Sequence, residues 1–267
     1  DGKHTDGNRF SIFGGFDWQE TDTLQLGLMG RISHTTSKAT DRINLGYMPG
    51  QEIVGRVATD VADTNIALGA YLMETVNEKV RIYGNAMADM HIFDLSRTQN
   101  YVDAIDGDGA AFALSTEWGI MHDILNQYIV GNLYARAGYN FGFEVKEKAA
   151  GYDYMRLQSD GYWMFTPGYS VTAQKRIYPS AWFQIRPYAS VGVEYDVFGV
   201  PDSAEYKFTA ADVYTKYDIE IDPLWMNIGG GIEFLGANGV QMGVDYRYQY
   251  NDDIQLHNVR LSGSYRF

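Results

Sequence analysis

The chain lacks cysteine, has only 6 prolines and contains no long hydrophobic run among its 267 residues. Without cysteine no disulfide holds the fold, which suits a closed sheet because each strand is already tied to its neighbours. The longest uninterrupted apolar run, Ile66 to Met73, is far shorter than the roughly 18 to 20 residues that a membrane helix needs. The opening DGKHTDGNRF also lacks the apolar core of an export signal. A membrane-spanning helix is therefore excluded.

What the chain does contain is 29 glycines, 21 tyrosines and hydrophobic residues at alternate positions. In the last stretch, apolar, small or aromatic residues alternate with arginine and serine from Val259 to Phe267. Such a strand has one face for hydrocarbon and one for water. A final strand of this kind that ends on phenylalanine is typical of transmembrane β-barrels of bacterial outer membranes.

The same period of two is present in eleven segments of the chain. It predicts eleven strands, each with an apolar and a polar face. The segments cover residues 10–18, 24–32, 66–72, 80–92, 112–120, 133–143, 163–171, 185–193, 224–232, 240–248 and 259–267. We expect an all-β fold, a transmembrane antiparallel β-barrel, formed by a single domain over residues 1–267.

Connections of two lengths alternate between these segments, and outer-membrane barrels combine short periplasmic turns with long extracellular loops. If the carboxy terminus lies in the periplasm, these short turns lie there too, and every long polar segment lies outside. One short connection, Asn251 to Asp253, also lies on the outer side. The short turns are expected at Glu20 to Asp22, Val76 to Lys79, Asp123 to Asn126, Arg176 to Pro179 and Gly236 to Asn238, and the long loops at 37–63, 94–108, 147–155 and 199–221.

The strand number raises a question of closure. An even number of strands would return the amino end to the periplasm, whereas eleven leave Asp1 outside. The first and last strands of the chain then run in the same direction, so they could close the barrel only as a parallel pair. We therefore expect about 12 strands, of which one precedes Asp1. Direct pairing of residues 8–18 with residues 256–267 would contradict this count.

The charges fit a water-filled lumen, because arginines and acids fall almost entirely on the polar face. An arginine or lysine that points into lipid near the midplane costs about 2 to 4 kcal/mol. The residues expected to line the lumen are Arg31, Arg81, Asp89, Glu117, Arg136, Glu144, Arg186, Glu194, Glu233, Asp245, Arg247 and Arg260. The net charge of −13 then lies mainly on loops and turns. It argues against a nucleic-acid partner, which requires a basic face.

A family resemblance rests on several of these segments. RFSIFGGFDWQETDTLQLGLMGRISHTTSKAT resembles a strand hairpin of the form GxDxxxxDxLxLGxxxGYS in the autotransporter β-domain of type V secretion. The next hairpin, TNIALGAYLMETVNEKVRIYGNAMADMHIFD, is similar to the one that follows it there. SAWFQIRPYASVGVEYDVFG is similar to a late strand of the form LxPYxxxxYxxxF, and NVRLSGSYRF to the terminal strand.

The resemblance implies a barrel in the outer membrane of a Gram-negative bacterium that exports or anchors an N-terminal passenger domain, with a linker helix in the pore. It implies that the barrel assembly machinery reads the last strand, with Tyr265 and Phe267 as the assembly signal. The partners are then outer-membrane lipid and lipopolysaccharide, the assembly machinery and the chain's own passenger. We expect no cofactor, no metal and no catalytic residue.

Four local patterns suggest chemistry, but each has a simpler interpretation. Asp103, Asp106 and Asp108 have the appearance of a calcium loop but lack the full EF-hand ligand set, which favours a solvated acidic loop. The glycines at 229–231 lie within a strand, with no helix after them to form a phosphate site. Aromatic residues that suit the membrane interface, or alternatively a sugar platform, are Trp18, Trp163, Tyr246, Tyr248 and Tyr250.

The fourth pattern is Asp89 and His91, which face the lumen two residues apart and would be the first residues to test for hydrolysis. No serine nucleophile motif accompanies them, which favours a packed polar network. Two rival functions stay open: an outer-membrane barrel enzyme, a protease or lipase, and a passive porin or adhesin barrel. A passenger encoded upstream would favour the translocator. Hydrolytic activity of the refolded barrel would favour the enzyme, and conductance without an upstream passenger would favour the pore.

Overall fold

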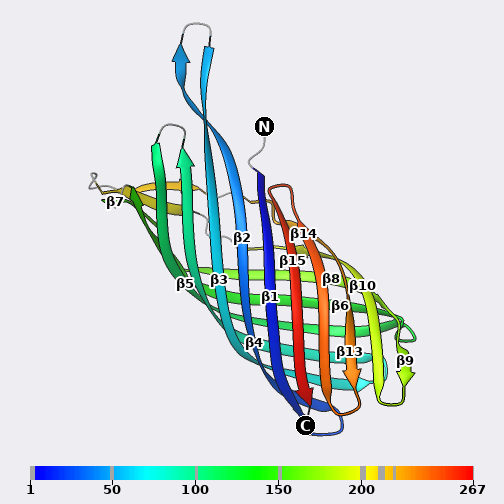
Figure 1. Ribbon diagram of the computed structural model, residues 1–267. Helices are drawn as coiled ribbons and strands as arrows, with labels where there is room; N and C mark the ends of the chain where they lie inside the picture. The colour runs from blue at the N-terminus through cyan, green and yellow to red at the C-terminus, as the bar shows by residue number, and fades with distance from the viewer. Residues whose placement is uncertain are drawn as a thin grey trace.

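The computed structural model describes residues 4–48, 51–99, 102–149, 152–198, 203–209, 214–218 and 221–266. Eleven of its strands form a closed barrel (Figure 1). They are β1 (His4–Gln19), β2 (Leu24–Met48), β3 (Gln51–Asn77), β4 (Val80–Gln99), β5 (Val102–Leu125), β6 (Ile129–Ala149), β8 (Tyr162–Gln174), β10 (Phe183–Tyr195), β13 (Leu224–Gly236), β14 (Val240–Tyr250) and β15 (Ile254–Arg266). The all-β barrel predicted from the period-2 pattern is confirmed.

Two pairings complete the barrel. β6 pairs with β8 from Ile129↔Ala173 to Asn140↔Tyr162, which joins the two ends of the strand order. β1 pairs directly with β15 in parallel, from Thr5↔Ile254 to Asp17↔Arg266. The expectation that these two strands are separated by a twelfth is therefore wrong for the described chain. The parallel ladder satisfies the edge groups of both strands, which an open barrel would leave unpaired.

Four further strands are present: β9 (Ile177–Ser180), which follows β8 along the same edge of β10, and β7 (Tyr152–Ser159), β11 (Ser203–Phe208) and β12 (Thr215–Asp218). β7 extends from β6 and pairs with β11, which pairs with β12. These three strands lean away from the barrel at the upper left of Figure 1.

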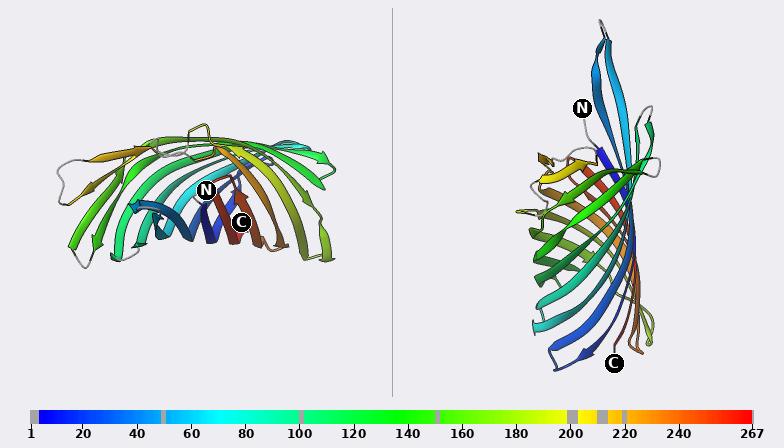
Figure 2. Two further views of the ribbon diagram at one scale, coloured as in Figure 1. Left: turned by 90° about the horizontal axis from the view of Figure 1, so that it is seen from above. Right: turned by 90° about the vertical axis from the view of Figure 1, so that its left-hand side faces the viewer.

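The two ends of the barrel differ, and we name them after their connections. The turn end carries residues 20–23, 78–79, 126–128, 181–182 and 237–239. It also holds the end of β15, whereas the amino end of the chain lies at the opposite, hairpin end (Figure 1). There the β2–β3 hairpin stands far above the rim (Figure 2). The alternation of short and long connections is as predicted.

The long polar segments are not loops, however. The β2–β3 ladder continues to Met48↔Gln51, the β4–β5 ladder to Gln99↔Val102 and the β6–β7 ladder to Ala149↔Tyr152. Backbone groups pair in a hairpin whatever the polarity of the side chains. Outside the bilayer the outer face also meets water, so the strands persist while their period-2 pattern disappears. In segment 199–221 the structure describes only parts, among them β11 and β12.

The turn expected at Arg176 to Pro179 is also wrong. The chain resumes pairing after Arg176 as β9, which lies against β10 through Ile185↔Ile177 and Phe183↔Ser180. The reversal comes at residues 181–182 instead. Pro179 is compatible with this strand because β9 pairs with β10 alone, and an edge strand tolerates a residue without an N–H donor.

A β-bulge interrupts β6 at Phe141 and Gly142. The partner of Ala113 on β5 is Asn140, and the partner of Ala111 is Phe143, so two residues of β6 oppose one of β5. Gly142 has a φ of 88°, and its N–H donates to the side chain of Asn140 at 2.9 Å. Every residue of β6 beyond this point therefore faces the opposite way from the uninterrupted pattern.

Candidate functional site: the barrel lumen

The strand register separates the side chains into two faces. On the outer face the apolar residues of the eleven segments are exposed, with Leu68 at 69% and Val191 at 57%. The inner face carries the charged residues, and several of its carboxylates are buried, with Asp89 at 6% and Glu194 at 5% exposure. Because direct cross-strand partners share a face, this sorting is continuous around the barrel.

Arg136 is the centre of one inner-face network. Its guanidinium pairs with Glu117 on β5 at 3.7 Å and with Glu194 on β10. Tyr83 donates its hydroxyl to Glu117 at 2.8 Å, and Tyr134 donates to Glu194 at 2.5 Å. Each carboxylate is thus ion-paired with the Arg136 guanidinium and accepts a hydrogen bond from a phenol, which compensates the loss of its hydration.

Gly168 makes the contact between β6 and β10 possible. Strand β8 lies between them, and a Cβ at Gly168 would lie 2.7 Å from the ring of Tyr134. The missing side chain lets Tyr134 reach across β8 to Glu194. The sequence pattern places all these residues inward, but does not indicate which of them meet.

A second network joins β2, β3 and β4. Arg31 binds Asp89 at 2.6 Å and also donates to the side-chain oxygen of Asn65 at 3.1 Å. The amide of Asn65 donates to Asp89 at 3.2 Å and lies 3.1 Å from Nε2 of His91. Nδ1 of His91 lies 3.0 Å from Asp63. Arg31 and Asp89, both predicted to line the lumen, are therefore in direct contact.

This network bears on the hydrolase interpretation of Asp89 and His91. The two side chains are linked through Asn65 and not to each other. The hydroxyl of Ser115 donates to Asp89 at 3.4 Å. In the described part of the chain His91 has no serine, threonine or cysteine partner, so the geometry is that of a polar network without a paired nucleophile.

The remaining predicted lumen residues fall into three groups. Arg186 donates to Glu233 at 2.7 Å and Arg260 to Asp245 at 2.7 Å, in each case between neighbouring strands on the inner face. Arg81 and Arg247 also lie on the inner face but are exposed. The third group is Glu144 alone.

Glu144 does not face the lumen. It lies opposite Ala110 and Gln158 on the outer face, and 47% of its side chain is exposed. Its ion-pair partners are Lys146 at 3.9 Å and Arg156 at 3.8 Å. The physical reason is the bulge at Gly142, which reverses the alternation and also turns Phe143 inward.

One buried ion pair of the inner face was not predicted at all. Arg97 on β4 binds Glu147 on β6 at 2.5 Å, and only 2% of the Glu147 side chain is exposed. Burial raises the pKa of the Glu147 carboxyl, while the charge of Arg97 acts in the opposite direction. Both residues lie in segments that were expected to be loops, where the period-2 pattern offers no signal.

The other patterns singled out above are placed as follows. Tyr265 is on the outer face, 43% exposed, between Phe16 and Val240 on the adjacent strands, and Phe267 lies outside the described residues. Asp106 and Asp108 are exposed along β5, and the side chain of Asp103 lies outside the described set. Among described residues no group of acids and histidines has metal-binding geometry.

The glycines at 229–231 lie within β13, and a Cβ at Gly231 would come 2.9 Å from the hydroxyl of Tyr188. Gly231 therefore makes room for the bulky lumen side chain of Tyr188.

Aromatic residues gather on the outer face near the hairpin end. Tyr248 lies 5.3 Å from Tyr250 and 4.9 Å from His257, measured between ring centroids. Trp163 is 67% exposed and lies 5.0 Å from Tyr139. Rings with a polar edge at this level suit a membrane interface.

No helix in the described part of the chain is long and apolar enough to cross a membrane.

No curated protein sequence matches the chain. Solved structures that are similar to it include three autotransporter domains. The translocator domain of the autotransporter NalP from Neisseria meningitidis has 14% identity and a TM-score of 0.48, covering 95% of this chain and 84% of that one. The transport unit of AIDA-I from Escherichia coli has 12% identity and a TM-score of 0.46, covering 90% and 75%.

The β-domain of the Bordetella autotransporter BrkA has 11% identity and a TM-score of 0.42, covering 98% of this chain and 96% of that one. The decisive comparison is with a family model described as Autotransporter beta-domain, which matches residues 1–247. It agrees with the closed barrel, the apolar outer face and the charged lumen. The chain therefore belongs to the autotransporter β-domain family and is an outer-membrane translocator barrel.

Proposed function

We propose that the lumen conducts a polypeptide segment of the same protein across the outer membrane and exports or anchors an N-terminal passenger. The observation that carries this is the arrangement of the inner-face charges. Every described ion pair of the inner face joins two neighbouring strands or two strands with a single strand between them. The charges are thus held against the wall, and none of these pairs spans the lumen.

The proposal includes an orientation, with the turn end in the periplasm and the hairpin end outside. The polar β2–β3 hairpin supports it, since a long projection of this kind is usual for the extracellular side. Lipid and lipopolysaccharide then contact the apolar outer face. The barrel assembly machinery recognises β15, with Tyr265 and Phe267 as the signal.

The function is tested by display. A reporter epitope fused ahead of Asp1, behind an export signal, should become accessible to antibody on intact cells when the barrel is inserted. A second epitope inserted between Met48 of β2 and Gln51 of β3 reports the orientation. A barrel that inserts with the hairpin tip outside and leaves the fused reporter in the periplasm would contradict the proposal.

A further inference from the structure

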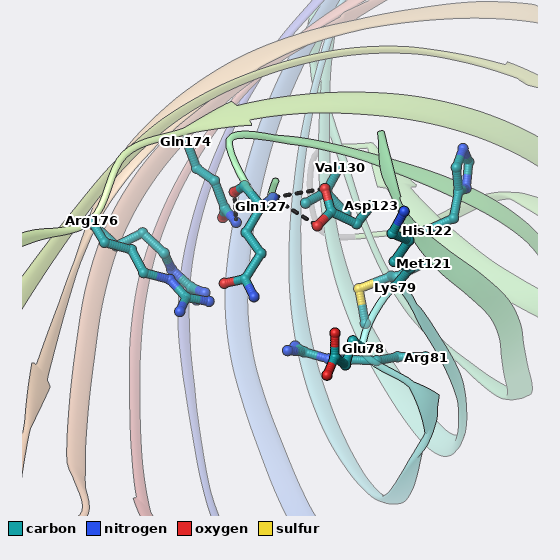
Figure 3. Close-up of a pocket in the computed structure, with 11 residues that line it drawn as sticks. Glu78, Lys79, Arg81, Met121, His122, Asp123, Gln127, Val130, Gln174 and Arg176 are labelled. Carbon is teal, nitrogen blue, oxygen red and sulfur yellow. Dashed lines mark hydrogen bonds between the residues drawn. The ribbon is translucent and has the colours of Figure 1, made fainter. Parts of the chain in front are cut away.

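A cleft opens on the inner side of the turn end, between β4, β5, β6, β8 and β10. Figure 3 shows Arg176, Gln127, Glu78 and Arg81 arranged around it. The lining comes from turns and strand ends far apart in the sequence: Glu78, Lys79, Arg81, His122, Asp123, Gln127, Gln174, Arg176 and Arg186, with Met121 and Val130. A segment that enters the lumen from this end passes the cleft first.

The cleft has more positive than negative side chains. It has four cationic side chains, Lys79, Arg81, Arg176 and Arg186, against the two carboxylates of Glu78 and Asp123. Of the four cations only Arg186 forms an ion pair within the described part of the chain, with Glu233. Deeper in the lumen, Arg31, Arg136 and Arg260 are each matched by a carboxylate.

The carboxylate of Asp123 is already engaged. Both of its oxygens accept the backbone N–H of Gln127 at 2.7 Å, across the turn that joins β5 to β6. Gln127 itself has a φ of 66°, and its carbonyl accepts from Gln174 at 2.9 Å. These bonds hold the turn in place, and Lys79, Arg81 and Arg176 are exposed to solvent.

We infer that this cleft binds the carboxylate side chains of an acidic polypeptide segment as it enters the lumen. The inference rests on the proposed function and names the class of segment that the barrel captures best. Unpaired cations in a cleft with low-dielectric walls focus the field and raise the local concentration of anionic ligands. Arginine also forms bidentate bonds with carboxylates, which adds affinity to this steering.

The test is a binding measurement on the complete 267-residue chain in detergent micelles. The probes are fluorescent peptides of about 20 residues in which glycine alternates with glutamate, glutamine or lysine, and the readout is fluorescence anisotropy at low salt. We expect the glutamate peptide to bind at least about tenfold more tightly than the glutamine peptide. The double variant Arg81→Gln and Arg176→Gln should lose most of this preference.

A matched control makes the same change of charge elsewhere. Lys38→Gln with Lys146→Gln removes two exposed lysines on the outer face near the hairpin end, 62% and 56% exposed, and should leave the preference intact. Equal binding of glutamate and glutamine peptides, or equal loss in both double variants, would overturn the inference. If inorganic phosphate displaces the glutamate peptide at the same concentration of negative charge, the cleft is a phosphate site, and this result would also overturn the inference.

The display experiment separates this inference from the proposed function. A barrel that displays the fused reporter without preferring the acidic peptide overturns the inference and leaves the function standing. A barrel that binds the acidic peptide without displaying the reporter overturns the function.

Discussion

At the scale of single residues, one glycine determines the direction of a whole strand end. Gly142 occupies a positive φ that side-chain-bearing residues rarely adopt, and a Cβ there would lie 2.3 Å from the carbonyl oxygen of Ser159. Because the bulge depends on this residue, so do the outward position of Glu144 and the inward position of Phe143.

We therefore expect Gly142→Ala to destabilise the folded barrel by about 1 to 3 kcal/mol, the usual cost of a residue held in an unfavourable backbone region. The measurement is the urea midpoint of tyrosine and tryptophan fluorescence in lipid vesicles. Gly14→Ala is the control, since the nearest atom to a Cβ there is 3.6 Å away. Equal midpoints for the two variants would mean that the bulge does not depend on Gly142.

Adjacent residues on one strand test the assignment of faces. Val191→Arg places a charge in lipid at a cost of about 2 to 4 kcal/mol, whereas Ser190→Arg points into the lumen. Val191 pairs with Val171 and Ile228 on its two sides, all on the outer face. We expect membrane levels to fall for Val191→Arg and to be maintained for Ser190→Arg, as measured by fractionation and immunoblotting. Similar behaviour of the two variants would refute the register of β10.

At the scale of strands, the parallel contact of β1 and β15 is the unusual element. All the other strand pairs in the sheet are antiparallel within the described chain. Towards the turn end the contact passes through the small residues Gly14 opposite Gly263 and Gly15 opposite Ser264, and then through the aromatic pair Phe16 opposite Tyr265.

A pair of cysteines can test this contact. Gly14→Cys with Gly263→Cys should form a disulfide when the chain is refolded under oxidising conditions, because direct partners in a ladder lie within the distance that a disulfide spans. The control, Gly14→Cys with Met242→Cys, places the second cysteine one strand further on and should stay reduced. The readout is migration on gels before and after reduction. Absence of the first disulfide in a folded barrel would mean that β1 and β15 are not direct partners.

At the scale of the molecule, closure gives the barrel its resistance to unfolding. Each barrel strand has a partner on both sides, so no strand can leave without breaking two ladders. We expect the protein, extracted in mild detergent, to migrate faster on SDS gels without heating than after heating. Identical migration under both conditions, together with solubility in the absence of detergent, would contradict a membrane barrel.

The sequence by itself determined the features that depend on neighbouring residues. The period of two established the strands, their two faces and the outward position of residues such as Val191 and Leu68, because alternation is a local property of an extended backbone. The alternation of connection lengths distinguished the two ends. The inward positions of Arg31, Arg136 and Arg260 followed from the same local rule.

Tertiary structure decided everything that depends on pairing between distant segments. The parallel contact of β1 with β15, the bulge that turns Glu144 outward and the extended hairpins in place of loops all depend on register. So do the bonds of Arg136 to Glu194 and the gathering of Arg81 with Arg176 at the turn end. The alternating pattern predicts which face of the sheet a side chain lies on, but not which strand lies beside it. Strand pairing is fixed by backbone hydrogen bonds between distant segments, and the alternating pattern is the same in all of these segments.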